Sequence, residues 1–161
     1  MKLLHKLGLF ALVLSLGLIL VGCGKEEAKD KNIDGSLEDI MSKVYEQLPE
    51  DKRPMGLTNM EVNAENIEGF LGTADIEYEE ALASESMVGS IAHSVVLVRL
   101  DKKADIEATK KAIKENVNPR KWICVGVEED QVIVKNKGNL VILIMAAENS
   151  DKLEAGFDNL K

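Results

Sequence analysis

Two side chains in this sequence, Cys124 and His93, are of the types that form nucleophilic catalytic pairs. An imidazole can take the proton of a neighbouring thiol and so activate it as a nucleophile. Cys124, however, stands in the apolar segment Trp122-Ile123-Cys124-Val125, where a thiol usually behaves as a small buried hydrophobic group. We therefore expect Cys124 to be buried and inert, and we assign no catalytic residue. An enzyme that uses His93 and Cys124 stays open as the alternative.

Carboxylates gather in two short stretches, 77–80 and 128–130. Their oxygens suit a divalent cation, but acid-rich turns and strand faces are usually just solvated. The sequence has no Cys/His cluster for zinc and no DxDxDG loop for calcium, so it predicts no metal and no cofactor. The Gly-rich phosphate loop and the GxSxG and SxxK signatures are absent as well. Catalysis by clustered carboxylates, and a cation held by the acidic region 61–85, stay open.

The other cysteine, Cys23, ends an apolar run that follows two lysines. The run, 7–21, is shorter than the about 20 apolar residues of a stable membrane span and fits the apolar region of a secretory signal. Its ending, Leu20-Val21-Gly22-Cys23, resembles the lipobox of bacterial lipoprotein precursors. The resemblance implies that a signal peptidase cleaves between Gly22 and Cys23 and that the Cys23 thiol carries a diacylglyceryl group.

This resemblance also implies a location. A single acyl chain anchors a protein only marginally, since each buried methylene contributes about 0.8 kcal/mol, whereas two chains hold it durably. We therefore expect a lipid anchor at the outer face of the cytoplasmic membrane, and the excess of Lys over Arg is typical of Gram-positive bacteria of low GC content. An ordinary cleaved signal, or an uncleaved anchor with an incidental cysteine, is the alternative.

The acidic net charge limits the classes of partner that the protein can bind. Removing residues 1–22 takes away Lys2 and Lys6 and changes the formal net charge from −8 to −10. A chain this acidic is a poor ligand for nucleic acid and is not attracted to an anionic membrane surface. The sequence therefore predicts no nucleic-acid partner and a membrane attachment that depends on the lipid of Cys23. With Cys23 acylated, Cys124 has no partner for an intrachain disulfide.

The composition divides the chain into three parts. Residues 1–22 are the predicted signal peptide, and residues 23–35 are the lipidated cysteine and a charged tether that has too few apolar side chains to fold. Residues 36–161 form a single predicted domain, long enough for one hydrophobic core.

Apolar periodicity and capping residues predict the elements of this domain. Ser36, Asn63 and Asp105 are the expected N-caps of three helices. A hairpin turns at 136–138, where Val132–Val134 should pair with Leu140–Ile144. Helices are expected at 36–48, 63–72, 105–117 and 150–160, and strands at 76–85, 91–100, 131–135 and 139–146, with 122–125 strand-like as well.

These elements follow the order ααββαββα, which predicts a two-layer α+β domain: an antiparallel four-stranded sheet with packed helices. The strands 91–100 and 139–146 are nearly all aliphatic, without alternation. Such strands are buried on both faces, either by helices on both sides or by a partner subunit.

A second resemblance covers roughly residues 85–145, through "ESMVGSIAHSVVLVRL", "EATKKAIKENV" and "VIVKNKGNLVILIM". The layout is similar to that of small clostridial-type lipoproteins with a domain of unknown function. It implies attachment outside the cytoplasm and no known activity, and it carries over no catalytic residue.

Three functional classes follow. The first is a noncatalytic module that binds a protein, a second copy of itself, a wall polymer or a small unknown ligand. The second is the small cell-surface enzyme described above. The third is a transporter's solute-binding subunit, for whose usual two-lobed clamp the chain is short. Lysines and arginines crowd into 102–121, opposite in sign to 61–85, and either steer a partner or form a solvated helix surface.

Overall fold

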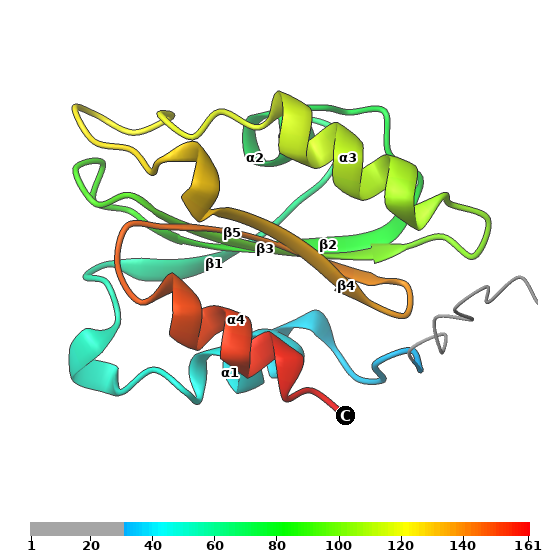
Figure 1. The fold of residues 1–161 in the computed structure, drawn as a ribbon, viewed down its shortest axis with the longest axis horizontal. Helices are drawn as coiled ribbons and strands as arrows, with labels where there is room; N and C mark the ends of the chain where they lie inside the picture. The colour runs from blue at the N-terminus through cyan, green and yellow to red at the C-terminus, as the bar shows by residue number, and fades with distance from the viewer. Residues whose placement is uncertain (1–30) are drawn as a thin grey trace, which may run out of the picture.

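A five-stranded antiparallel sheet lies at the centre of the computed structural model, which describes residues 31–161 (Figure 1). Its strand order is β1-β2-β3-β5-β4. The strands are β1 (Leu57–Glu61), β2 (Tyr78–Ser86), β3 (His93–Leu100), β4 (Val132–Lys137) and β5 (Leu140–Ala146). The helices are α1 (Leu37–Tyr45), α2 (Ile67–Leu71), α3 (Ile106–Asn116) and α4 (Ser150–Asp158), with single 3₁₀ turns η1 (Glu50–Lys52) and η2 (Glu129–Gln131).

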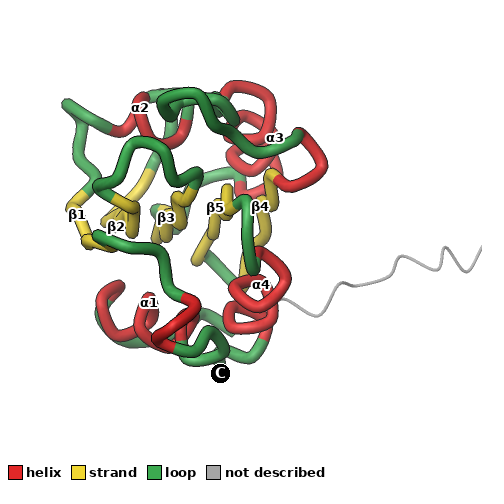
Figure 2. Tube along the Cα trace, turned by 90° about the vertical axis from the view of Figure 1, so that its left-hand side faces the viewer, coloured by secondary structure: helices red, strands yellow, loops and turns green. Residues whose placement is uncertain are grey.

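Helices cover both faces of this sheet. Helices α1 and α4 pack on one face, and α2 and α3 pack on the other, as Figures 1 and 2 show from two directions. The expectation of two layers is therefore wrong, and the domain has three. The reason lies in β3 and β5, whose aliphatic side chains point alternately to the two faces, so that each face needs a cover. Of the two explanations for these apolar strands, helices on both sides is the one observed.

The sheet has one more strand than the sequence predicts. Strand β1 is an edge strand that pairs with β2 from Leu57↔Ser86 to Glu61↔Leu82. Its sequence, LTNME, is mostly polar and shows no regular alternation of burial. Sequence patterns miss it because pairing with a neighbouring strand, and not a local preference, makes it extended. The order along the chain is accordingly αβαββαββα.

Two of the three predicted helix caps are confirmed, whereas Asn63 does not cap α2, which begins after Asn66 and has no side-chain cap. The Ser36 hydroxyl accepts a hydrogen bond from the Asp39 N–H at 3.2 Å, and an Asp105 carboxylate oxygen accepts one from the Ala108 N–H at 3.0 Å. Each bond satisfies an N–H that the helix itself leaves unpaired. The apolar stripe that follows Ser36 is buried as expected, and it consists of Leu37, Ile40, Met41, Val44, Tyr45 and Leu48.

The predicted hairpin is confirmed too. Strands β4 and β5 pair from Val132↔Met145 to Lys137↔Leu140, and Gly138 turns the chain with a φ of +54°. The segment 122–125, by contrast, is a loop and not a strand. Cys124 has a φ of +61°, in the left-handed region, and the Ile123 N–H donates to the Gly89 carbonyl at 2.8 Å. Strand-like composition fails here because a tertiary contact, and not a strand partner, holds the loop.

The residues just before α1 lie against one end of the sheet. Arg99 of β3 donates to the carbonyls of Ile33 and Gly35, both at 2.7 Å, and Ile33 is buried in the core under α1. The Asn139 N–H donates to the Asn32 side-chain oxygen at 3.1 Å. The end of the predicted tether is thus held at the β4–β5 turn.

Candidate functional site: a pocket at the His93 end of the sheet

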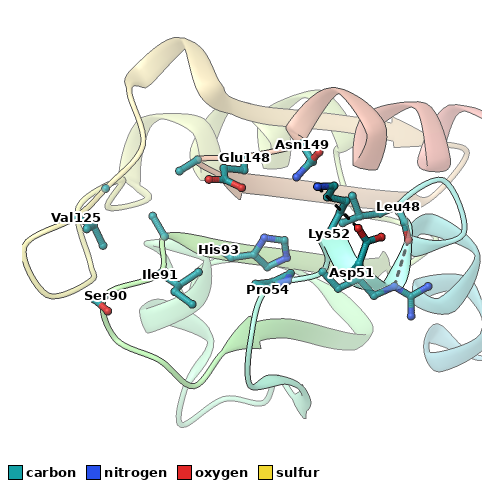
Figure 3. Close-up of a pocket in the computed structure, with 14 residues that line it drawn as sticks. Leu48, Asp51, Lys52, Pro54, Ser90, Ile91, His93, Val125, Glu148 and Asn149 are labelled. Carbon is teal, nitrogen blue, oxygen red and sulfur yellow. Dashed lines mark hydrogen bonds and ion pairs between the residues drawn. The ribbon is translucent and has the colours of Figure 1, made fainter.

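A cavity of about 590 Å³ opens at the end of the sheet where β3 begins and β5 ends (Figure 3). His93 and Ala146 are paired at this end. Four separate connections surround the cavity: the stretch 51–54, the β2–β3 connection at 90–92, the loop at 125–126 and the β5–α4 connection at 147–149. A volume of this size is within the usual range for small-molecule sites.

His93 forms a buried part of this pocket. Only 4% of its surface is exposed, and its Nε2 lies 2.6 Å from the Tyr45 hydroxyl, a hydrogen bond between β3 and α1. Nδ1 has no hydrogen-bond partner among the described residues, so it is the ring nitrogen left for a ligand. Sequence analysis singled out His93, and the structure places it in a cavity.

The two members of this pair are uncharged at neutral pH. Burial lowers the pKa of His93 to about 4, although the negative charge of Glu85 acts in the opposite direction. Burial raises the pKa of the Tyr45 phenol above its ordinary value of 10, and the neighbouring Ser84 hydroxyl and Arg53 guanidinium offset this only partly. His93 therefore offers the pocket a hydrogen bond without a charge.

Arg53 fixes the wall of the pocket next to this pair. Its guanidinium donates to the carbonyls of Leu48 and Tyr45, both at 3.3 Å, and lies 5.8 Å from the centre of the Tyr45 ring. These contacts tie the stretch after α1 back onto the helix. They use two of the five N–H donors of Arg53.

Charges of both signs lie at the rim. Asp51 and Lys52 form a loose, exposed ion pair with a separation of 3.8 Å. Glu148 and Asn149 lie across the cavity from Pro54 and His93 (Figure 3), and Asn149 has a left-handed φ of +59°. Within the described part of the chain, Glu148 makes no ion pair.

Cys124 is not where the sequence suggests. It is exposed, so the expectation that it is buried is wrong. The error has the same cause as the wrong prediction of a strand at 122–125, because Cys124 stands in a surface loop and not in a sheet. Although Val125 and Gly126 line the pocket, Cys124 does not, and the structure does not bring its thiol together with His93.

The carboxylate stretches do not assemble either. Among residues 31–161 no group of three or more His, Cys, Asp or Glu side chains is arranged to hold a metal ion. Glu80 pairs with Arg99 at 2.7 Å, and Glu128 lies 3.5 Å from Arg120. The acidic and basic stretches also meet each other, since Lys121 contacts Glu85 and Ser94. Much of this charge is therefore used inside the domain.

Cys23 and Gly22, the predicted lipidation and cleavage positions, lie outside the described residues. Within those residues no helix has the length and apolar character needed to cross a bilayer. Sequence analysis missed Lys52, Glu148 and Asn149, since charged and polar residues in turns are common and nothing local marks them. Their signal is spatial, because the strand order alone brings these connections to one end of the sheet.

Comparison of the chain with protein-family models, with curated proteins and with solved structures finds no match. The geometry of the pocket therefore carries the functional argument.

Proposed function

We propose that this protein is a lipid-anchored binding protein at the outer face of the cytoplasmic membrane of a Gram-positive bacterium. In this proposal Cys23 is the acylated mature N-terminus, and the pocket at the His93 end of the sheet is the binding site. The lipobox resemblance of Leu20-Val21-Gly22-Cys23 supports the anchor. The similarity to small clostridial-type lipoproteins is in keeping with it.

One observation carries the binding role: the anchor side and the pocket lie at opposite ends of the sheet. Asn32, Ile33 and Gly35 are held by Arg99 and Asn139, whereas the pocket surrounds His93. Arg99 and His93 stand near the two ends of β3, which is about 23 Å long at about 3.3 Å per residue. A protein tethered through residues 23–31 would thus present the pocket away from the membrane.

The enzyme alternative has less support. It requires an activated nucleophile or a base, and the Cys124 thiol does not line the pocket that holds His93. With a pKa near 4, His93 is also a weak base at neutral pH. Binding needs only the hydrogen bond and the cavity, so we infer a noncatalytic role.

The anchor is tested by growing cells with a fatty-acid probe and weighing the N-terminal peptide of the mature protein. We expect a diacylglyceryl group on Cys23 and no label in the Cys23→Ala variant, which should remain unprocessed. Cys124→Ser is the matched control and should be labelled like the wild type. An unlipidated Cys23, or normal processing of Cys23→Ala, would overturn the proposal.

A further inference from the structure

We propose that the pocket at the His93 end binds a small aliphatic zwitterion, of the free amino acid or dipeptide class. This inference rests on the proposed function, since it takes the same pocket as the binding site. It goes further by naming the ligand chemistry from the order of charges, hydrogen-bonding groups and apolar side chains around the cavity.

A carboxylate fits the side of the rim formed by Lys52 and Asn149. In Figure 3 these two side chains point toward one another above the cavity. The Asn149 side chain makes no capping hydrogen bond to α4, so its amide stays available to an acceptor. The Lys52 ammonium, which pairs only loosely with the exposed Asp51 at 3.8 Å, favours a negative group there.

An ammonium group fits the adjacent position. Glu148 directly precedes Asn149, lines the same cavity, and lacks an ion-pair partner among residues 31–161. A negative position thus lies beside a positive one. An α-amino acid carries its ammonium and carboxylate groups on one carbon, which matches two neighbouring subsites of opposite charge.

The rest of the cavity suits an aliphatic body. Ile91, Pro54 and Val125 form apolar walls, and the cavity lining contains no Phe, Tyr or Trp on which a planar ring would stack. His93 adds one uncharged hydrogen-bonding atom, Nδ1, which is buried beside these walls and suits an amide group. The cavity is larger than a single amino acid needs, which leaves room for a dipeptide.

The test uses soluble protein that begins at Gly24, with L-leucine and L-leucyl-L-leucine as probes in calorimetric titrations. N-acetyl-L-leucine lacks the ammonium charge, and L-leucinamide lacks the carboxylate. We expect saturable one-to-one binding of at least one zwitterion, accompanied by a shift of the His93 imidazole NMR signals. Each single-charge analogue should bind at least about tenfold more weakly, because one charged subsite then has no partner.

Substitutions of the rim test the two subsites separately. Glu148→Gln and Lys52→Gln should each weaken zwitterion binding about tenfold, and Glu148→Gln should leave N-acetyl-L-leucine binding unchanged. Lys111→Gln, on the exposed surface of α3, is the matched control and should change nothing. All three sites are on the surface, and thermal unfolding verifies that the variants fold.

Two results would overturn the inference: no saturable binding of either zwitterion up to about 10 mM, or equal binding of the zwitterions and their single-charge analogues. Either result would leave the lipid anchor standing, because that fails only if Cys23 carries no lipid. The two failures are therefore distinguishable.

Discussion

The two ends of the sheet differ in how their polar groups are used. At the end of the sheet where the predicted tether enters the domain, Arg99 donates to two carbonyls and to the Glu80 carboxylate, and the β4–β5 turn lies against Asn32. At the pocket end, His93 leaves one ring nitrogen without a partner, and Glu148 makes no ion pair within the described residues. The exposed large apolar side chains of the described residues, Met55, Met87 and Ile123, also come from loops at this end.

This difference separates structural from binding roles within one sheet. Interactions that are complete inside the domain hold the chain where the tether enters it. Groups without a partner among the described residues lie around a cavity about 20 Å away, six residues along β3 from Arg99. Loops on a rigid sheet commonly carry binding residues for this reason, since the sheet fixes their position while their own side chains remain free.

The largest expected effect is the pH dependence of stability that His93 causes. Its pKa is about 4 in the folded protein and near 6.5 in the unfolded chain, so the unfolded state takes up the proton first as the pH falls. The stabilisation is complete above pH 6.5 and is lost between about pH 6.5 and 4, by roughly 3 kcal/mol. Urea unfolding of the soluble protein at several pH values measures this loss.

Carboxylates also change the unfolding free energy at the acid end of this pH range. The contribution of His93 is therefore measured by comparing the wild type with His93→Gln, a variant that can keep a hydrogen bond to Tyr45. The variant should lack the part of the slope between pH 5 and 6.5. An NMR titration that gives His93 an ordinary pKa near 6.5 would contradict the account of this pocket.

A smaller effect distinguishes the two ends through their glycines. Gly138 has a φ of +54°, and a Cβ there would lie 2.4 Å from the Asn32 side-chain oxygen and 2.9 Å from its backbone. Gly138→Ala should therefore cost about 2 kcal/mol of unfolding free energy. At the other end, a Cβ on Gly89 would lie 3.1 Å from Ile123 Cδ1, the tip of an exposed and movable side chain.

Gly89→Ala is the matched variant, and it should change the free energy of unfolding by less than about 0.5 kcal/mol. Chemical denaturation of both proteins under the same conditions gives the comparison. Equal losses of stability at the two positions would show that the ends do not differ in rigidity.

The smallest effect concerns Cys124, also at the pocket end. Because this side chain is exposed in a loop, Cys124→Ser should change the free energy of unfolding by less than about 0.5 kcal/mol. A thiol reagent should label Cys124 in the native protein at a rate similar to that in the denatured protein. Slow labelling that requires unfolding would restore the view of a buried cysteine.

The sequence predicts those elements whose signals are local. Helices α1 and α3 follow from their capping residues and apolar stripes, and the β4–β5 hairpin follows from Gly138 between two apolar runs. Strand β1 depends on its pairing with β2, and the loop at 122–125 depends on its contact with Gly89, and no short segment encodes either. The third layer could be predicted from the sequence, since burial of β3 and β5 on two sides requires a cover on each face of the sheet.

The candidate site was predictable only in its central residue. His93 stands out because it is the imidazole that remains beyond the predicted signal peptide. Lys52 and Glu148 are ordinary surface charges in the sequence, and they become a site only through the antiparallel pairing of β3 with β5 and the return of the chain after α1. The predicted burial of Cys124 is wrong because its apolar neighbours in the sequence lie in a loop and not in the core.

Orientation on a membrane tests the central claim most directly. A dye is attached to Asp34→Cys or to Met87→Cys, both exposed positions, in lipidated mature protein that also carries Cys124→Ser. The protein is placed on vesicles whose lipid headgroups carry a quencher. We predict strong quenching at position 34, near the tether, and little at position 87, at the pocket end. Equal quenching, or stronger quenching at position 87, would contradict a pocket that faces away from the membrane.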